Sequence, residues 1–134
     1  MHITGGCHCG KITYQAEIDP ETVGLCHCTD CQILSGSAFR SSVPVTKADF
    51  KLTGQPKIYV KTAESGAKRA KAFCPDCGTH VYAAAPVDPQ LFNIRTGTVN
   101  QRSQLKPKRQ IWCDSAQSWA MDLNAIAKVA RQPG

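Results

Sequence analysis

The stretch from Cys26 to Cys31, with the sequence Cys-His-Cys-Thr-Asp-Cys, has the densest set of reactive side chains in the chain. Its three thiols form a C-x-C-x-x-C pattern, and deprotonated thiols are both soft metal ligands and nucleophiles. All three can point at one ion if the backbone turns sharply between Cys28 and Cys31. Catalytic zinc sites typically use three protein ligands and leave one position open, so the stretch predicts a zinc site with room for a substrate. The alternative is a structural site that a fourth ligand closes.

Four other cysteines occur as two pairs. Cys7 and Cys9 lie in a glycine-rich loop, and Cys74 and Cys77 belong to a C-P-x-C-G knuckle. Two such pairs can combine into a closed four-cysteine zinc site that ties the N-terminal loop to the middle of the chain. The sequence does not force this division. Three further residues could supply a fourth ligand to the three-cysteine stretch at residues 26–31: His27, His80 and Cys113.

Each of these three residues also has a structural interpretation. We expect the side chain of His27 to point away, toward solvent or a carboxylate, because one ion rarely takes three consecutive residues as ligands. His80 is either a packed, hydrogen-bonded histidine or an acid–base group of the site. Cys113 is expected to be a small buried hydrophobic residue rather than a nucleophile. Arg40 follows the thiols closely in sequence and is our first candidate for the capture of an anionic substrate.

The length of 134 residues fits a single domain that spans residues 1–134 and buries a core without disulfides. No apolar run is long enough to span a membrane, and the first residues lack the pattern of a signal peptide. We therefore expect a cytoplasmic protein. In that compartment, clustered cysteines are more often metal ligands or catalytic groups than disulfides.

The net charge of +6 and the pI of about 9.0 indicate an anionic partner. Lysine and arginine are spread along the chain, with denser groups at residues 68–71 and 106–109. Neither group is interleaved with aromatic residues on which bases could stack, which argues against a nucleic acid. A small anionic substrate is the remaining expectation.

Turn residues at short intervals separate segments of alternating polarity, which predicts a mainly β fold with metal knuckles. A short helix is expected at residues 32–35, where Gly36 can provide the C-cap. A second short helix is expected at the C-terminus from Asp122 onward, because apolar residues recur there at helical spacing. We expect strands at residues 11–17, 38–45, 57–61, 68–73, 79–85, 91–99 and 109–113.

Several of these motifs together resemble the glutathione-dependent formaldehyde-activating enzyme family, over roughly residues 3 to 120. Centromere protein V carries a similar domain. The motifs are the runs 6–10, 26–31 and 74–79, with Gly36, Ile111, Trp112 and Trp119.

The resemblance implies an Mss4-like fold of several short antiparallel sheets. It implies a structural zinc site at Cys7, Cys9, Cys74 and Cys77, and a catalytic zinc site at Cys26, Cys28 and Cys31. It also implies an enzyme of the carbon–sulfur lyase type that condenses glutathione with formaldehyde to S-hydroxymethylglutathione. Glutathione would then be the thiol partner, in keeping with the basic charge of the chain.

Two rival functions stay open at this level. The first is a zinc-stabilised binding module for an anionic partner, with both metals structural and no catalysis. The second is thiol redox chemistry at Cys113, since zinc-binding methionine-sulfoxide reductases share the Mss4-like architecture. The paired C-x-x-C knuckles of those reductases are absent from this sequence, which disfavours the second rival.

Overall fold

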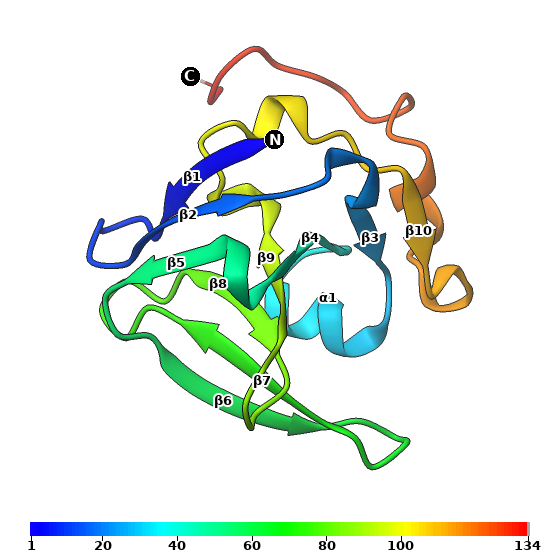
Figure 1. Cartoon of the computed structure of the whole chain (residues 1–134). Helices are drawn as coiled ribbons and strands as arrows, with labels where there is room; N and C mark the ends of the chain where they lie inside the picture. Colours follow the sequence, from blue (N-terminus) through cyan, green and yellow to red (C-terminus); the bar gives the residue numbers. More distant parts are fainter. Residues whose placement is uncertain (134) are drawn as a thin grey trace.

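The computed structural model describes residues 1–133, and it is mainly β, with two sheets and one short α-helix (Figure 1). The smaller sheet has three antiparallel strands in the order β1-β2-β5. These strands are β1 (His2–Gly6), β2 (Thr13–Glu17) and β5 (Phe50–Thr53). Burial alternates along β1 and β2, so each strand presents one face to the core; the sequence pattern predicted β2 but not β1.

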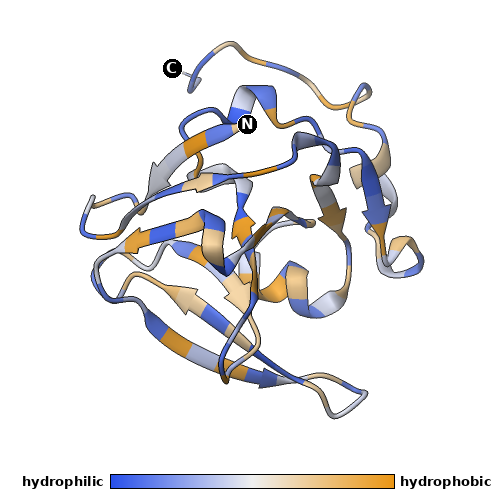
Figure 2. Ribbon diagram, viewed as in Figure 1, coloured by the Kyte–Doolittle hydropathy of each residue, from blue (hydrophilic) through white to orange (hydrophobic). Residues whose placement is uncertain are grey.

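The larger sheet has seven strands in the order β10-β3-β4-β9-β8-β7-β6. Its neighbours pair antiparallel except β10 and β3, which are parallel. Hydrophobic and hydrophilic residues alternate along strands such as β6 (Figure 2). In sheet order the strands are β10 (Arg109–Ile111), β3 (Gly24–Cys26), β4 (Arg40–Thr46), β9 (Leu91–Arg95), β8 (His80–Ala84), β7 (Lys68–Phe73) and β6 (Lys57–Thr62).

Helix α1 (Thr29–Ser35) follows β3 directly and begins three residues before the predicted start. Cys28 is its N-cap, and the Sγ atom of Cys28 accepts a hydrogen bond from the backbone N–H of Cys31 at 3.3 Å. Gly36 ends the helix in the left-handed region, with φ of 62°, as predicted for a glycine C-cap. The remaining helical turns are of the 3-10 type: Pro20–Thr22, Lys47–Asp49, Thr96–Thr98, Arg102–Gln104, Cys113–Ser115 and Ser118–Met121.

An aromatic cluster joins the two sheets. Phe50 on β5 packs against Tyr14 on β2, with ring centroids 5.7 Å apart, and also against two aromatic rings of the larger sheet. Those rings are Tyr82 on β8 and Phe92 on β9, whose centroids lie 5.8 and 5.1 Å from that of Phe50. Buried aliphatic residues from both sheets surround this cluster, among them Ile3, Val43, Val81 and Ile94. The two sheets therefore share one core.

The predicted C-terminal helix is wrong. After the 3-10 turn at Ser118–Met121, the backbone up to residue 133 forms turns and irregular structure without an α-helix. The apolar residues that suggested a helix stay exposed, with Leu123 at 52% and Ile126 at 50%. An isolated short helix is marginal in water, because most helical stability comes from packing of an apolar face.

Several strand boundaries also differ from the prediction, and two of these differences concern strands β2 and β9. The first predicted strand begins at Thr13 instead of residue 11, and the strand expected over residues 91–99 ends at Arg95. A 3-10 turn at Thr96–Thr98 follows, and the hydroxyl of Thr98 donates to the carbonyl of Arg95 at 2.7 Å. This local bond offers the backbone an alternative to the sheet. Within the described residues, no helix is long and apolar enough to cross a membrane.

Candidate metal centres and the adjoining cavity

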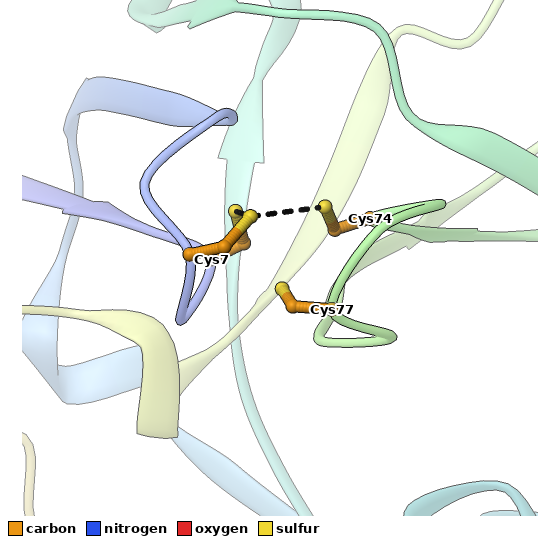
Figure 3. A group of neighbouring side chains, drawn as sticks. Cys7, Cys74 and Cys77 are labelled. Atoms are coloured by element: carbon orange, nitrogen blue, oxygen red, sulfur yellow. Dashed lines mark hydrogen bonds between the residues drawn. The ribbon is translucent and has the colours of Figure 1, made fainter.

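The four cysteines of the two pairs form one cluster, called here the four-cysteine cluster: Cys7, Cys9, Cys74 and Cys77. Their Sγ atoms all lie within 4.8 Å of one another. The loop after β1 supplies one pair, and the turn between β7 and β8 supplies the other. Figure 3 shows Cys74 and Cys77 directed toward the side of the cluster where Cys7 lies.

The sulfur geometry of this cluster fits a tetrahedral metal. Sulfurs bound to one zinc at about 2.3 Å lie roughly 3.8 Å apart in a tetrahedron. The Cys7 and Cys9 sulfurs are 3.6 Å apart, and those of Cys9 and Cys74 are 3.7 Å apart. All eight cysteines of the chain are free thiols, so no disulfide competes for these sulfurs. The donor set and its spacing therefore suit zinc.

Hydrogen bonds from the protein favour thiolates in the four-cysteine cluster. The hydroxyl and backbone N–H of Thr79 interact with Cys77 and lower the pKa of its thiol to about 5. The backbone N–H of Ile12 lies 3.3 Å from the Cys7 sulfur. The backbone of Lys11 lowers the pKa of Cys9, but burial and the neighbouring thiols outweigh it and raise that pKa to about 12. Without a cation, therefore, the four sulfurs cannot all be charged at neutral pH.

The remaining three thiols form a second group, the three-cysteine cluster: Cys26, Cys28 and Cys31. Cys26 ends β3, Cys28 caps α1, and Cys31 lies in the first turn of that helix. The sharp turn expected between Cys28 and Cys31 is thus the first turn of α1. The three Sγ atoms lie within 4.8 Å of one another, and among residues 1–133 no fourth Cys, His, Asp or Glu joins the group.

The surroundings of the three-cysteine cluster shift the pKa values of Cys31 and Cys26 in opposite directions. Burial raises the pKa of Cys31, but the charge of Arg40 and hydrogen bonds from Arg40 and the two neighbouring thiols together outweigh it, so that pKa lies below its ordinary value. Burial also raises the pKa of Cys26, to about 12, and the Cys28 and Cys31 thiols add to that effect. In the metal-free protein, Cys31 is therefore the preferred thiolate. Three thiols around one position, with no fourth side chain, are also suited to a cation.

Residues considered as fourth ligands lie elsewhere. The side chain of His27 was predicted to face solvent or a carboxylate, and it does neither. It is buried, at 1% exposure, and its Nε2 atom is 2.7 Å from the amide oxygen of Gln110. The parallel strand β10 brings Gln110 into this position, which sequence periodicity alone did not reveal. The prediction for Cys113 is also wrong, because this thiol is exposed in the 3-10 turn after β10.

A cavity of about 620 Å³ adjoins the three-cysteine cluster. Cys31 and Arg40 line it, together with residues of α1 and of the larger sheet. His80 also lines this cavity and stacks on Phe73, with ring centroids 5.8 Å apart. His80 is therefore packed, as the first interpretation requires, but without the expected side-chain hydrogen bond within residues 1–133, and it lies at the cavity, as the second requires. Its pKa is lowered by burial and by the nearby charges of Arg95 and Lys71, so the imidazole is neutral at pH 7.

Two cations of this cavity, Lys71 and Arg95, escaped the sequence analysis. Lys71 lies between Ala70 and Ala72 in β7, and only 5% of it is exposed. Arg95 shares a face of β9 with Asn93, because alternate residues of a strand point to the same side. A lysine flanked by alanines within a predicted strand was the only sequence signal that Lys71 is buried. Its proximity to Arg95 follows from the order of strands in the sheet.

Together, the two sheets and the two cysteine clusters define a mainly β protein with two sites at its turns that could hold a metal ion. The sequence model of one family, described as glutathione-dependent formaldehyde-activating enzyme, matches residues 2–115. The chain belongs to this family, and its fold is Mss4-like. No curated protein sequence matches the chain.

Among solved structures, the fold is similar to that of a Rhodobacter sphaeroides protein, with a TM-score of 0.59. The two sequences are 17% identical, and the match covers 80% of this chain and 98% of that one. At this identity the likeness concerns the fold alone.

Proposed function

We propose that the protein is a zinc-dependent carbon–sulfur lyase that condenses glutathione with formaldehyde. The observation that carries the proposal is the three-cysteine cluster beside a cavity, with no fourth protein ligand among the described residues. In this proposal Cys7, Cys9, Cys74 and Cys77 hold a structural zinc, and Cys26, Cys28 and Cys31 hold a catalytic one. Residues 1–134 act as one domain, since both sheets share a core.

The reaction adds the thiol of glutathione across the carbonyl of formaldehyde. A carbon–sulfur bond forms, the C=O π bond breaks, and the thiol proton ends on the new hydroxyl group, so S-hydroxymethylglutathione is the only product. A zinc in the three-cysteine cluster would favour the thiolate form of the incoming thiol at neutral pH. The protein must then exclude water, orient the thiol and carry its proton.

Residues of the cavity supply these roles. The positive charge of Arg40 next to Cys31 favours a thiolate at this end of the cavity. His80 is neutral at pH 7, so we assign its imidazole to accept the thiol proton and return it to the alkoxide. Leu34 and Phe39, both half-buried, contribute apolar surface to the same lining, which limits the access of water.

The proposed location is the cytoplasm, because both clusters require reduced thiols and all eight cysteines are free. Exchange spectroscopy with 13C-formaldehyde and glutathione tests the activity, since it measures enzyme-accelerated formation and breakdown of the adduct at equilibrium. Zinc-loaded wild-type protein should accelerate this exchange and Cys31→Ser should not. Cys113→Ser, which removes the exposed thiol outside both clusters, is the matched control and should retain the rate.

If zinc-loaded wild-type protein leaves the exchange rate unchanged, the lyase function is wrong. The same chain would then be a zinc-stabilised binding module for an anionic partner. If Cys113→Ser abolishes the acceleration and Cys31→Ser does not, the chemistry is located at Cys113 and the assignment of the three-cysteine cluster fails.

A further inference from the structure

Three cationic side chains from three different strands converge on the cavity beside Cys31. Arg40 comes from β4, Lys71 from β7 and Arg95 from β9, and all three line the cavity. The strand order brings them together, since β4 pairs with β9 and β8 separates β9 from β7. Ser42, two residues after Arg40, is the cross-strand partner of Arg95. No aspartate or glutamate lines this cavity.

These cations have few partners in the protein. Within residues 1–133, the ammonium group of Lys71 has no hydrogen bond or ion pair, although only 5% of the residue is exposed. Arg40 and Arg95 are half-buried, and the Nη1 atom of Arg95 and the Nε atom of Arg40 are buried without a hydrogen-bond partner, whereas the Nη1 atom of Arg40 donates to the hydroxyl of Ser42. The hydrogen bond and charge of Lys61 and, to a smaller extent, the charge of Lys71 lower the pKa of Asp30. This carboxylate already forms an ion pair with Lys61, at 2.7 Å. Gathering cations at a largely buried place without a counter-charge is costly, so their presence needs an explanation.

The proposed metal balances only part of this charge. Zinc with three thiolates carries a net charge near −1, and it faces three cations in the cavity. Roughly two positive charges therefore stay uncompensated. Burial, together with the charge of Arg95, lowers the pKa of Lys71 to about 8, which is consistent with an ammonium that lacks a counterion. An anion from outside the chain would complete the balance.

We propose that Lys71 and Arg95 form a subsite for a carboxylate of the same molecule whose thiol lies at the three-cysteine cluster. The proposal rests on the proposed function and extends it to substrate selection. Because Cys31 lines the same cavity as the two cations, sulfur and carboxylate occupy one continuous space. Thiols with a carboxylate are then preferred to neutral thiols of similar size. Lys71 and Arg95 determine this specificity, whereas the three-cysteine cluster determines capture of the sulfur.

The test compares three ligands by calorimetry on zinc-loaded protein. Glutathione has both thiol and carboxylates, its diethyl ester keeps only the thiol, and S-methylglutathione keeps only the carboxylates. Hydrogen bonds to charged groups contribute enough that wild type should bind glutathione on the order of tenfold or more tightly than the diester. Lys71→Met should remove most of this preference and leave the affinity for the diester unchanged. Lys68→Met, an exposed lysine on the same strand, is the matched control and should keep the preference.

A second readout separates a binding role from a structural one. Loss of a buried, unpaired ammonium should leave the melting temperature of the ligand-free Lys71→Met protein equal to or above that of wild type. A lower melting temperature would make Lys71 a structural residue and overturn the subsite. If Lys71→Met does not fold, that result also counts against the proposal. Arg95→Gln gives an independent check, with the same expected loss of preference for glutathione over the diester.

The outcomes distinguish the subsite from the proposed function. Equal affinity of wild type for glutathione and its diester, or an undiminished preference in Lys71→Met, would overturn the subsite. If S-methylglutathione binds as tightly as glutathione while the ester effect still depends on Lys71, the subsite stands and capture of the sulfur fails. A further outcome is that inorganic phosphate competes with glutathione in wild type but not in Lys71→Met, while wild type binds glutathione and its diester equally. That result would overturn the subsite, because the cavity would then bind a free oxyanion and not a substrate carboxylate.

Discussion

Arg40 is the residue opposite Cys26 in the antiparallel ladder between β3 and β4. This pairing places a fixed positive charge against the three-cysteine cluster, where it opposes the effect of burial and lowers the pKa of Cys31. The charge comes from a strand, and the thiolate that it favours lies in the first turn of a helix. Their relative position is thus set by the rigid part of the fold.

The four-cysteine cluster should be essential for folding. Cys74 is fully buried in this cluster, and zinc binding by small structural sites is on the order of 10 kcal/mol, comparable to the stability of a whole domain. Cys74→Ser should therefore unfold the protein or lower its melting temperature sharply, as measured by circular dichroism with zinc analysis. Cys113→Ser should behave as wild type. Retention of wild-type zinc content and stability by Cys74→Ser would refute the closed structural site.

The three-cysteine cluster should bind a separable second zinc. Cys31→Ser should lower the zinc content from about two ions per chain to about one and abolish activity, because two thiolates hold zinc far less tightly than three. The melting temperature should fall much less than in Cys74→Ser, since the four-cysteine cluster is intact. Elemental analysis and thermal unfolding measure both effects. An unchanged zinc content would show that Cys31 is not a ligand.

Salt should weaken the binding of glutathione. Part of its attraction to the protein should come from the net charge of +6, and exposed charges are screened over about 10 Å at 0.1 M salt. We expect the affinity measured by calorimetry to fall roughly threefold to tenfold between 0.05 and 0.5 M sodium chloride. The affinity for the diethyl ester should change little over the same range. A salt effect of the same size for both ligands would indicate a general change in the protein.

Stability at alkaline pH should depend on Lys71. Its pKa falls from an ordinary 10.5 to about 8 in the folded protein because of burial and the charge of Arg95. Below pH 8 both folded and unfolded states carry the proton, and the full cost of the buried charge is present. Between pH 8 and 10.5 the unfolded state binds more protons, so the stability of wild type rises relative to that of a variant without the amine.

Denaturant unfolding of zinc-loaded wild type and Lys71→Met measures this difference, and the cysteine contributions largely cancel between the two proteins. The variant should be more stable at pH 7, by at most on the order of 3 kcal/mol, and its advantage should shrink as the pH approaches 10.5. An advantage that grows with pH would contradict the lowered pKa.

Gly5 should be required for the close approach of β1 to the segment around Val99. Gly5 and Val99 form an isolated antiparallel bridge. A Cβ atom at Gly5 would overlap the carbonyl oxygen of Thr98 and the hydroxyl of Tyr14. Gly5→Ala should lower the free energy of unfolding by about 1–3 kcal/mol or more. Gly24→Ala is the control, because its Cβ would meet only Arg109 at an ordinary 3.5 Å. Equal stability of the two variants would contradict this account.

Some features of this protein were determined by local sequence. The C-x-C-x-x-C spacing put three sulfurs in reach of one point, because a cap and a first helical turn are all that separates Cys28 from Cys31. Gly36 ended α1 where predicted, since it alone readily adopts the left-handed conformation. The mainly β fold followed from alternation between frequent turns, and the family from the cysteine motifs. All of these depend on neighbours along the chain.

Other features were decided only by the tertiary structure. The burial of His27 against Gln110 needed the parallel pairing of β10 with β3. The C-terminal apolar residues have helical spacing, yet they stay largely exposed in the folded chain. The cation group of the cavity needed the order β4-β9-β8-β7, which places residues 40, 71 and 95 on one face. A strand pattern specifies which side a residue faces but not which strand lies beside it, because pairing depends on the energy of the whole sheet.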